Sequence, residues 1–257
     1  MTDFERTFDN AVEEYDDNRP MYPTQLFADL LAYQPLGTNS CALEIGLGSG
    51  KASKPVLDTG CRLVGVEPGE QLAAVAKARF QSYPNFSLHQ QTLQEYQGRE
   101  GSFDLIYAAT AFHWIAEEYG YPRVYELLKP GGTFARFAYH AGQDQGRKAL
   151  AEEIQEVYRA CMPGSKTPVP FGQADAERLA GLAVKYGFAD STYKLYYITK
   201  DFTADRYIDL LKTYPNHMAL EETNRKKLFH GIYQAIVRHG GVITIYYTMD
   251  MELARKP

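Results

Sequence analysis

A short apolar run, Cys41 to Ile45, leads directly into a glycine-rich loop and then into a helical pattern. The loop has glycine at every second position: Gly46, Gly48 and Gly50. Glycine lets the backbone adopt positive φ and approach a ligand closely, and a strand, a glycine loop and a helix together form the usual nucleotide-binding element of open α/β sheets. The loop therefore predicts an α/β fold with a ligand at the carboxyl end of this strand, although a plain tight turn would use the same glycines.

The spacing of the glycines and a nearby acid narrow the class of ligand. A dinucleotide fingerprint reads G-x-G-x-x-G, and its last glycine allows close packing of helix on strand. Here that last position holds Lys51, so the register is G-x-G-x-G. Glu44 places a carboxylate beside the loop, which would repel a pyrophosphate and attract a cation. The same carboxylate could instead accept backbone N–H bonds and tie down the loop.

Two further strand ends carry candidate ligand contacts. Glu67 ends the second predicted strand, where an acid can accept both hydroxyls of a ribose, or can cap the helix that begins near Glu70. Gln91, Thr92 and Leu93 follow the third predicted strand and could present backbone groups, a hydroxyl and an apolar wall to an adenine ring. A plain loop is equally compatible with that segment.

The fourth predicted strand ends at Ala109, and small residues then lead to an aromatic pair, His113 and Trp114. This pair could line a substrate site, or it could be a packed tryptophan beside a hydrogen-bonded histidine. Tyr139 ends the fifth predicted strand. All of these candidates lie at the carboxyl ends of predicted parallel strands, which is where open α/β sheets bind ligands.

Apolar runs alternate with helical patterns along most of the chain, which predicts a largely parallel seven-stranded sheet with helices on both faces. The predicted strands are Cys41 to Ile45, Leu63 to Glu67, Phe86 to His89, Phe103 to Ala109, Thr133 to Tyr139, Tyr193 to Ile198 and Val242 to Thr248. We expect one domain made of N-terminal lid helices (1–35), a cofactor-binding core (36–140), a helical insertion (141–190) and the remaining core elements (191–257).

Composition limits the classes of partner. The net charge of -5 argues against a nucleic-acid-binding surface and favours a small-molecule substrate. Cys41, Cys61 and Cys161 lack the C-x-x-C spacing of a zinc or redox site, so we expect no metal and reduced thiols in a cytoplasmic protein. No signal peptide and no run long enough to span a membrane are found in the sequence. Nothing in it indicates an oligomeric state.

Several motifs resemble those of class I S-adenosylmethionine-dependent methyltransferases: LEIGLGSG at 43–50, VGVEP at 64–68, FDLI at 103–106 and LLKPGGTF at 127–134. YDDNRPMYP at 15–23 and AFHWI at 111–115 are similar to trans-aconitate methyltransferases and other small-molecule O-methylating enzymes. The resemblance implies a Rossmann-like sheet with an antiparallel last strand, S-adenosylmethionine as the cofactor, and methyl transfer to an oxygen or nitrogen of a small molecule.

The resemblance also assigns residues to roles. The cofactor-binding set it implies is Glu44, Gly46, Gly48, Gly50, Glu67, Pro68, Gln91, Thr92, Leu93 and Ala109. The substrate-contacting set is Tyr15, Arg19, Tyr22, Trp114 and Tyr139, the first three on an N-terminal segment that folds over the cofactor in such proteins. His113 is the candidate general base. Two rival hypotheses remain: a cofactor-binding protein without catalysis, and a nicotinamide-dependent oxidoreductase.

Overall fold

A computed structural model describes residues 19–144 and 146–257. Their contacts divide the chain into two compact units, each assembled from separate segments. Unit 1 contains the described residues up to Pro20, together with His140–Phe171 and Tyr197–Thr248. Unit 2 contains Met21–Tyr139, Gly172–Tyr196 and Met249–Pro257. The chain passes from one unit to the other inside three of its strands.

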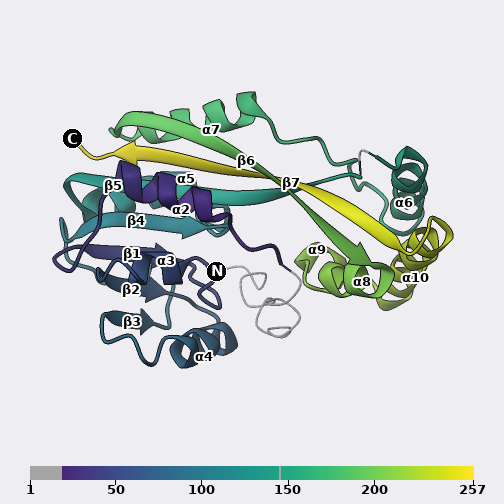
Figure 1. The fold of residues 1–257 in the computed structure, drawn as a ribbon, viewed down its shortest axis with the longest axis horizontal. Helices are drawn as coiled ribbons and strands as arrows, with labels where there is room; N and C mark the ends of the chain where they lie inside the picture. The colour runs from purple at the N-terminus through teal and green to yellow at the C-terminus, as the bar shows by residue number, and fades with distance from the viewer. Residues whose placement is uncertain (1–18, 145) are drawn as a thin grey trace. The chain divides into compact units, whose positions relative to one another are not determined.

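The strands form a seven-stranded sheet in the order β3-β2-β1-β4-β5-β7-β6 (Figure 1). Their bounds are β1 Cys41–Ile45, β2 Arg62–Val66, β3 Phe86–His89, β4 Phe103–Ala109, β5 Leu128–Gly142, β6 Ala189–Thr203 and β7 Val242–Arg255. Strand β1 pairs in parallel with β2 and with β4, and β4 pairs in parallel with β5. The carboxyl ends of these four strands therefore share one edge of the sheet.

Strand β7 runs antiparallel to β5. The N–H of Lys256 donates to the carbonyl of Gly132, and further along β5 the N–H of Ala138 donates to the carboxylate of Asp250. From Gly132 to Ala138 along β5, the bonded residue on the other side changes from Lys256 to Asp250, so the two strands run in opposite directions. The prediction of a mostly parallel, Rossmann-like seven-stranded sheet is confirmed, including its antiparallel last strand.

Helices cover both faces of the sheet in unit 2. Alternate residues of β1 point to opposite faces, so that Leu43 packs with α5 (Glu117–Leu127) and α7 (Gln173–Lys185), whereas Ala42 packs with α2 (Thr24–Tyr33) and α3 (Ser53–Leu57). The remaining helices are α4 (Glu70–Arg79) and, in unit 1, α6 (Lys148–Cys161), α8 (Ala204–Lys212), α9 (Pro215–Met218) and α10 (Glu222–Arg238). None of the helices in the described part of the chain is long and apolar enough to cross a membrane.

Three strands are longer than their sequence patterns predict. The predicted runs ended at Tyr139, Ile198 and Thr248, but β5, β6 and β7 continue to Gly142, Thr203 and Arg255. In β6, exposed and partly buried residues alternate along nearly the whole strand, so its hydrophobic signal is weak. Hydrophobic periodicity marks where a strand is buried and does not mark where its backbone pairing stops.

Truncating a central side chain of the sheet should destabilise the fold. Ile106 of β4 is fully buried among aromatic and aliphatic side chains. Ile106→Ala should lower the free energy of unfolding by about 2–5 kcal/mol, because it removes buried methyl groups and leaves a cavity. Chemical denaturation measures the loss. The control is Val184→Ala on α7, where the side chain is 55% exposed and the change should stay within about 0.5 kcal/mol. Equal losses in both variants would contradict the assignment of this core.

Candidate active site

The glycine loop between β1 and α3 has positive φ at all three alternate glycines, with values of 63°, 59° and 84° at Gly46, Gly48 and Gly50. A Cβ on Gly46 would lie 2.5 Å from the Cβ of Ala111, and one on Gly50 would overlap the ring of Phe80. A Cβ on Gly48 would meet no atom of the described residues within 4 Å, its two chain neighbours apart. Packing thus accounts for two of the glycines, while Gly48 borders open space into which a ligand could fit.

Glu67 connects the glycine loop to the following helix. It directly follows β2 and is 6% exposed. One carboxylate oxygen accepts from the N–H of Gly48 at 2.7 Å and the other accepts from the N–H of Gly69, the N-cap residue of α4, at 2.8 Å. The capping role considered from the sequence is therefore present, and the same carboxylate also reaches the glycine loop. Pro68, between these contacts, is partly exposed.

Glu44 is a buried carboxyl group at the end of β1, only 1% exposed. Its Oε2 accepts from the hydroxyls of Ser53 (2.6 Å) and Tyr107 (2.8 Å). Its Oε1 is buried without a hydrogen-bond partner among the described residues. Glu44 is thus held by side-chain hydroxyls from α3 and β4. The backbone N–H bonds considered from the sequence are not the contacts that these oxygens make with the described residues.

The electrostatics of Glu44 follow from its burial. Loss of hydration is the largest effect and, together with the negative charge of Glu67, it raises the pKa of this carboxyl to about 7, while the two hydroxyl bonds act to lower the pKa. A positive charge placed near the two acids would favour the ionised form of Glu44. This edge of the sheet is therefore suited to a cationic ligand.

The loop after β3 is organised by a local turn. The backbone N–H and hydroxyl of Thr92 both donate to the Glu95 carboxylate, at 2.9 and 3.0 Å, and the N–H of Glu95 lies 3.3 Å from the Thr92 hydroxyl oxygen. Leu93 is buried in the core, and the N–H of Gln91 donates to the carbonyl of His89. Sequence analysis missed Glu95, although T-x-x-E is the pattern of a capping box.

Tyr22 meets the carboxyl end of β4 through a residue that sequence analysis did not select. The Tyr22 hydroxyl shares a 2.7 Å hydrogen bond with the hydroxyl of Thr110. Its ring packs edge-on against Phe137 at 5.0 Å between centroids and lies 6.4 Å from Tyr139. Two predicted substrate contacts, Tyr22 and Tyr139, are thus brought together in unit 2, beside the partly buried Ala109.

His113 and Trp114 lie on a short 3-10 helix, Phe112–Trp114, that follows β4. Their rings are 4.9 Å apart, and both residues are exposed, Trp114 by 41%. The buried ring of this turn is Phe112, which packs on Tyr121. Trp114 is therefore not packed in the core, which was the second alternative considered from the sequence.

Arg19 belongs to unit 1. It is 8% exposed, and its guanidinium donates to the hydroxyl and the carbonyl of Thr213 at 3.2 and 3.1 Å and stacks 4.4 Å from the ring centre of Tyr214. Tyr15, the third predicted residue of the N-terminal segment, lies outside the described residues, as do the acids Asp16 and Asp17 that could pair with Arg19.

Part of the chain that includes the glycine loop resembles a known family. Residues 42–132, which run from β1 into β5 and include the glycine loop, match the family model described as a methyltransferase domain. This part of the chain is therefore similar to methyltransferase domains.

One relative extends the similarity to most of the chain, and others match part of it. An uncharacterized methyltransferase of Schizosaccharomyces pombe is 24% identical over 91% of this chain and 88% of its own. Trans-aconitate 2-methyltransferase of Deinococcus radiodurans is 30% identical, over 42% of this chain and 41% of its own. Phosphoethanolamine N-methyltransferase 2 of Haemonchus contortus was solved with phosphomonomethylethanolamine and S-adenosylhomocysteine. It shares the fold with a TM-score of 0.57 at 18% identity, and the match covers 100% of this chain and 61% of that one.

Proposed function

We propose that this chain binds S-adenosylmethionine on the loop 46–50 and transfers its methyl group to an oxygen or nitrogen of a small-molecule acceptor. One observation carries the proposal: Gly48 borders open space beside two acids, Glu44 and Glu67, both of them at least 94% buried (1% and 6% exposed). The cofactor is cationic at its sulfonium and ammonium groups and carries a ribose diol, so its charge and its hydrogen-bonding groups match these residues.

Different residues at and near the glycine loop would bind different parts of the cofactor. Glu67 would accept hydrogen bonds from the ribose hydroxyls, because each carboxylate oxygen can accept more than one hydrogen bond. Ionised Glu44 would stabilise the cationic end. Leu93 would form an apolar wall near Gln91 and Thr92, with Pro68 and Ala109 at the neighbouring strand ends.

When bound, the cofactor supplies a methyl group on sulfonium that a nucleophile can attack directly. The protein's part in such a reaction is alignment of the acceptor and exclusion of water, and alignment alone can supply roughly 7–11 kcal/mol. Tyr22, Tyr139 and Trp114 offer aromatic surfaces for an acceptor in unit 2. Contacts of Arg19 and Tyr15 with the acceptor stay a prediction from the family resemblance, in which Arg19 would orient a carboxylate.

A small acceptor is supported by the chain's acidic net charge and by relatives whose names include trans-aconitate and phosphoethanolamine. Calorimetric titration with S-adenosylhomocysteine and with NADH tests the cofactor. Methyl transfer from labelled S-adenosylmethionine to a panel of carboxylates and amines, including trans-aconitate and phosphomonomethylethanolamine, tests the reaction. Binding of NADH alone would contradict the proposal, and binding of S-adenosylhomocysteine without transfer to any acceptor would favour a non-catalytic binding protein.

His113 is the candidate base, which matters only when the acceptor is protonated at neutral pH. With such an acceptor, His113→Ala should lower kcat by about 100-fold or more, while the affinity for S-adenosylhomocysteine stays at the wild-type value. With a carboxylate acceptor the same variant should retain full turnover. His230→Ala on α10 is the control for loss of a histidine. Full turnover of His113→Ala with a protonated acceptor would remove this residue from the mechanism.

A further inference from the structure

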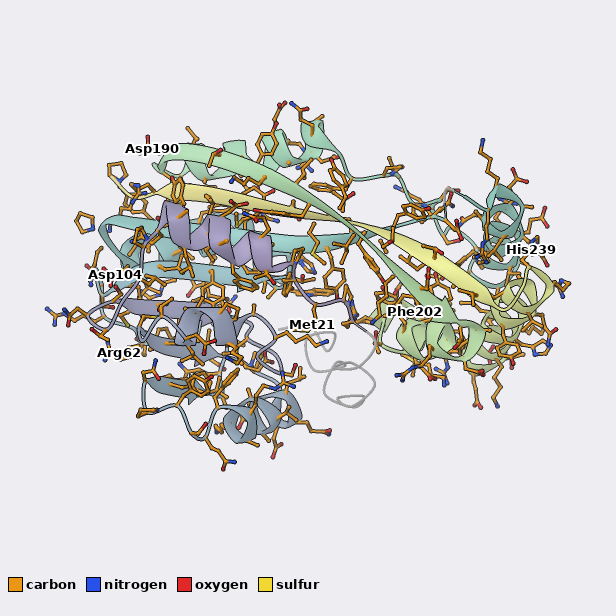
Figure 2. All side chains as sticks on the ribbon, viewed as in Figure 1. Met21, Arg62, Asp104, Asp190, Phe202 and His239 are labelled. Carbon is orange, nitrogen blue, oxygen red and sulfur yellow. The ribbon has the colours of Figure 1, made fainter. Side chains whose placement is uncertain are left out.

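Thr110 has an unusual backbone for its residue type. It has a φ of 55°, a left-handed conformation that is an outlier for β-branched residues. Only one other non-glycine residue among those described has positive φ, Asp190 near the start of β6, which Figure 2 labels. Backbone outliers of this kind persist when surrounding contacts hold them, and they cluster at functional sites.

Two short hydrogen bonds hold Thr110 in this conformation. Its N–H donates to the carbonyl of Phe137 on β5 at 2.7 Å, and its hydroxyl shares the 2.7 Å bond with Tyr22. The first continues the β4–β5 pairing one residue past the last paired residue of β4. The second joins the turn to the aromatic cluster of Tyr22, Phe137 and Tyr139.

The left-handed residue determines where the next residues go. The chain turns sharply after β4, so that Ala111 comes up against Gly46 of the glycine loop and the helix Phe112–Trp114 follows at once. Phe112 anchors that helix in the core, and His113 and Trp114 remain exposed. The position of both side chains relative to the glycine loop therefore depends on the conformation of Thr110.

We infer that Thr110 is a positioning residue for methyl transfer: its hydroxyl bond to Tyr22 fixes both the Tyr22 phenol and the turn that presents His113 and Trp114 to the acceptor. This inference rests on the proposed function, because it assumes that the glycine loop holds the cofactor. It assigns Thr110 no contact with the cofactor. Loss of the hydroxyl should therefore disturb the acceptor side and spare cofactor affinity.

Trp114 is the only tryptophan of the chain, so its fluorescence reports directly on this turn. Thr110→Val keeps the shape and removes the hydroxyl, Tyr22→Phe removes the other half of the bond, and Thr110→Ser keeps it. Tyr33→Phe is a matched control, because the Tyr33 hydroxyl donates at the same distance, 2.7 Å, to the carbonyl of Asp190, the other left-handed residue.

We expect Thr110→Val and Tyr22→Phe to shift Trp114 emission and increase its quenching by acrylamide, and to lose methyl transfer to an acceptor found in the panel. Thr110→Ser and Tyr33→Phe should match wild type, and the affinity for S-adenosylhomocysteine should stay within about threefold in all four variants. Unchanged emission in Thr110→Val and Tyr22→Phe, or wild-type transfer by Thr110→Val, would overturn the inference. Failure of the wild-type protein to bind S-adenosylhomocysteine would instead contradict the proposed function. In that case the fluorescence of Trp114 would still show whether Thr110 positions the turn.

Discussion

Gly48→Val should reduce the affinity for S-adenosylhomocysteine by more than about 100-fold, the largest binding effect expected from any single substitution in this chain. The new side chain would project into the space beside Gly48, where its Cβ meets no atom of the described residues within 4 Å apart from the two chain neighbours, and would occupy the path of the ligand. The left-handed backbone would add strain to the loop and weaken its N–H bond to Glu67. Isothermal titration calorimetry measures the loss.

Gly101→Val is the matched control for this experiment. Gly101 has a φ of 58°, against 59° at Gly48, and a Cβ there also meets nothing within 4 Å. It precedes β4, at the opposite edge of the sheet from the glycine loop. The two variants should therefore lose similar stability, and only Gly48→Val should lose binding. If Gly48→Val binds S-adenosylhomocysteine as tightly as Gly101→Val does, the loop is not the cofactor site.

The free energy of unfolding should fall as the pH rises from about 4.5 to about 7, because of Glu44. Desolvation raises the pKa of this carboxyl group from 4.5 to about 7. Between these values the folded state holds a proton that the unfolded chain has released, so the folded state loses its advantage as pH increases and the contribution is constant above pH 7. A shift of this size corresponds to about 3 kcal/mol. Replacing the buried Glu44 by Gln removes this titrating carboxyl group. The amide oxygen of Gln can still accept hydrogen bonds from the hydroxyls of Ser53 and Tyr107.

Urea denaturation of wild type and Glu44→Gln at pH 5, 6, 7 and 8 measures this difference. The variant should gain stability relative to wild type across the series, by up to about 3 kcal/mol. Burial and the neighbouring Asp250 also raise the pKa of Glu252, to about 9, so Glu252 adds its own pH dependence to the free energy of unfolding. This contribution is the same in wild type and variant, and the difference between the two proteins removes it. Parallel profiles would show that Glu44 does not titrate in this range. With ligand, the wild-type affinity for S-adenosylmethionine should rise toward pH 8, since a cation favours ionised Glu44, while that of Glu44→Gln should change less.

The cofactor half of the fold was predictable because its signals are local. The strands Cys41–Ile45, Phe86–His89 and Phe103–Ala109 have the predicted bounds, since each is a short segment with apolar residues on at least one face and is followed by a polar residue or a turn. The loop at Gly48 and the strand-end acid Glu67 could be located from spacing alone. These features depend on residues close together in the sequence.

The acceptor side depends on contacts between distant residues, which spacing does not reveal. Tyr22 and Thr110 are 88 residues apart, and nothing near Thr110 in the sequence indicates a left-handed backbone. Tyr107 reads as one apolar residue in a buried strand, yet its hydroxyl holds Glu44, 63 residues away. Arg19 could be selected as a candidate, but its bonds to Thr213 span 194 residues.

The position of β7 between β5 and β6 has a consequence for synthesis of the chain on the ribosome. Strand β6 finds its neighbour in the sheet only when β7, which follows it in the sequence after α8, α9 and α10, has been made. Until then β5 and β6 present unpaired edges that can associate with other chains. A nascent chain that has emerged as far as α10 would therefore depend on chaperones more than one that has emerged as far as the end of β7.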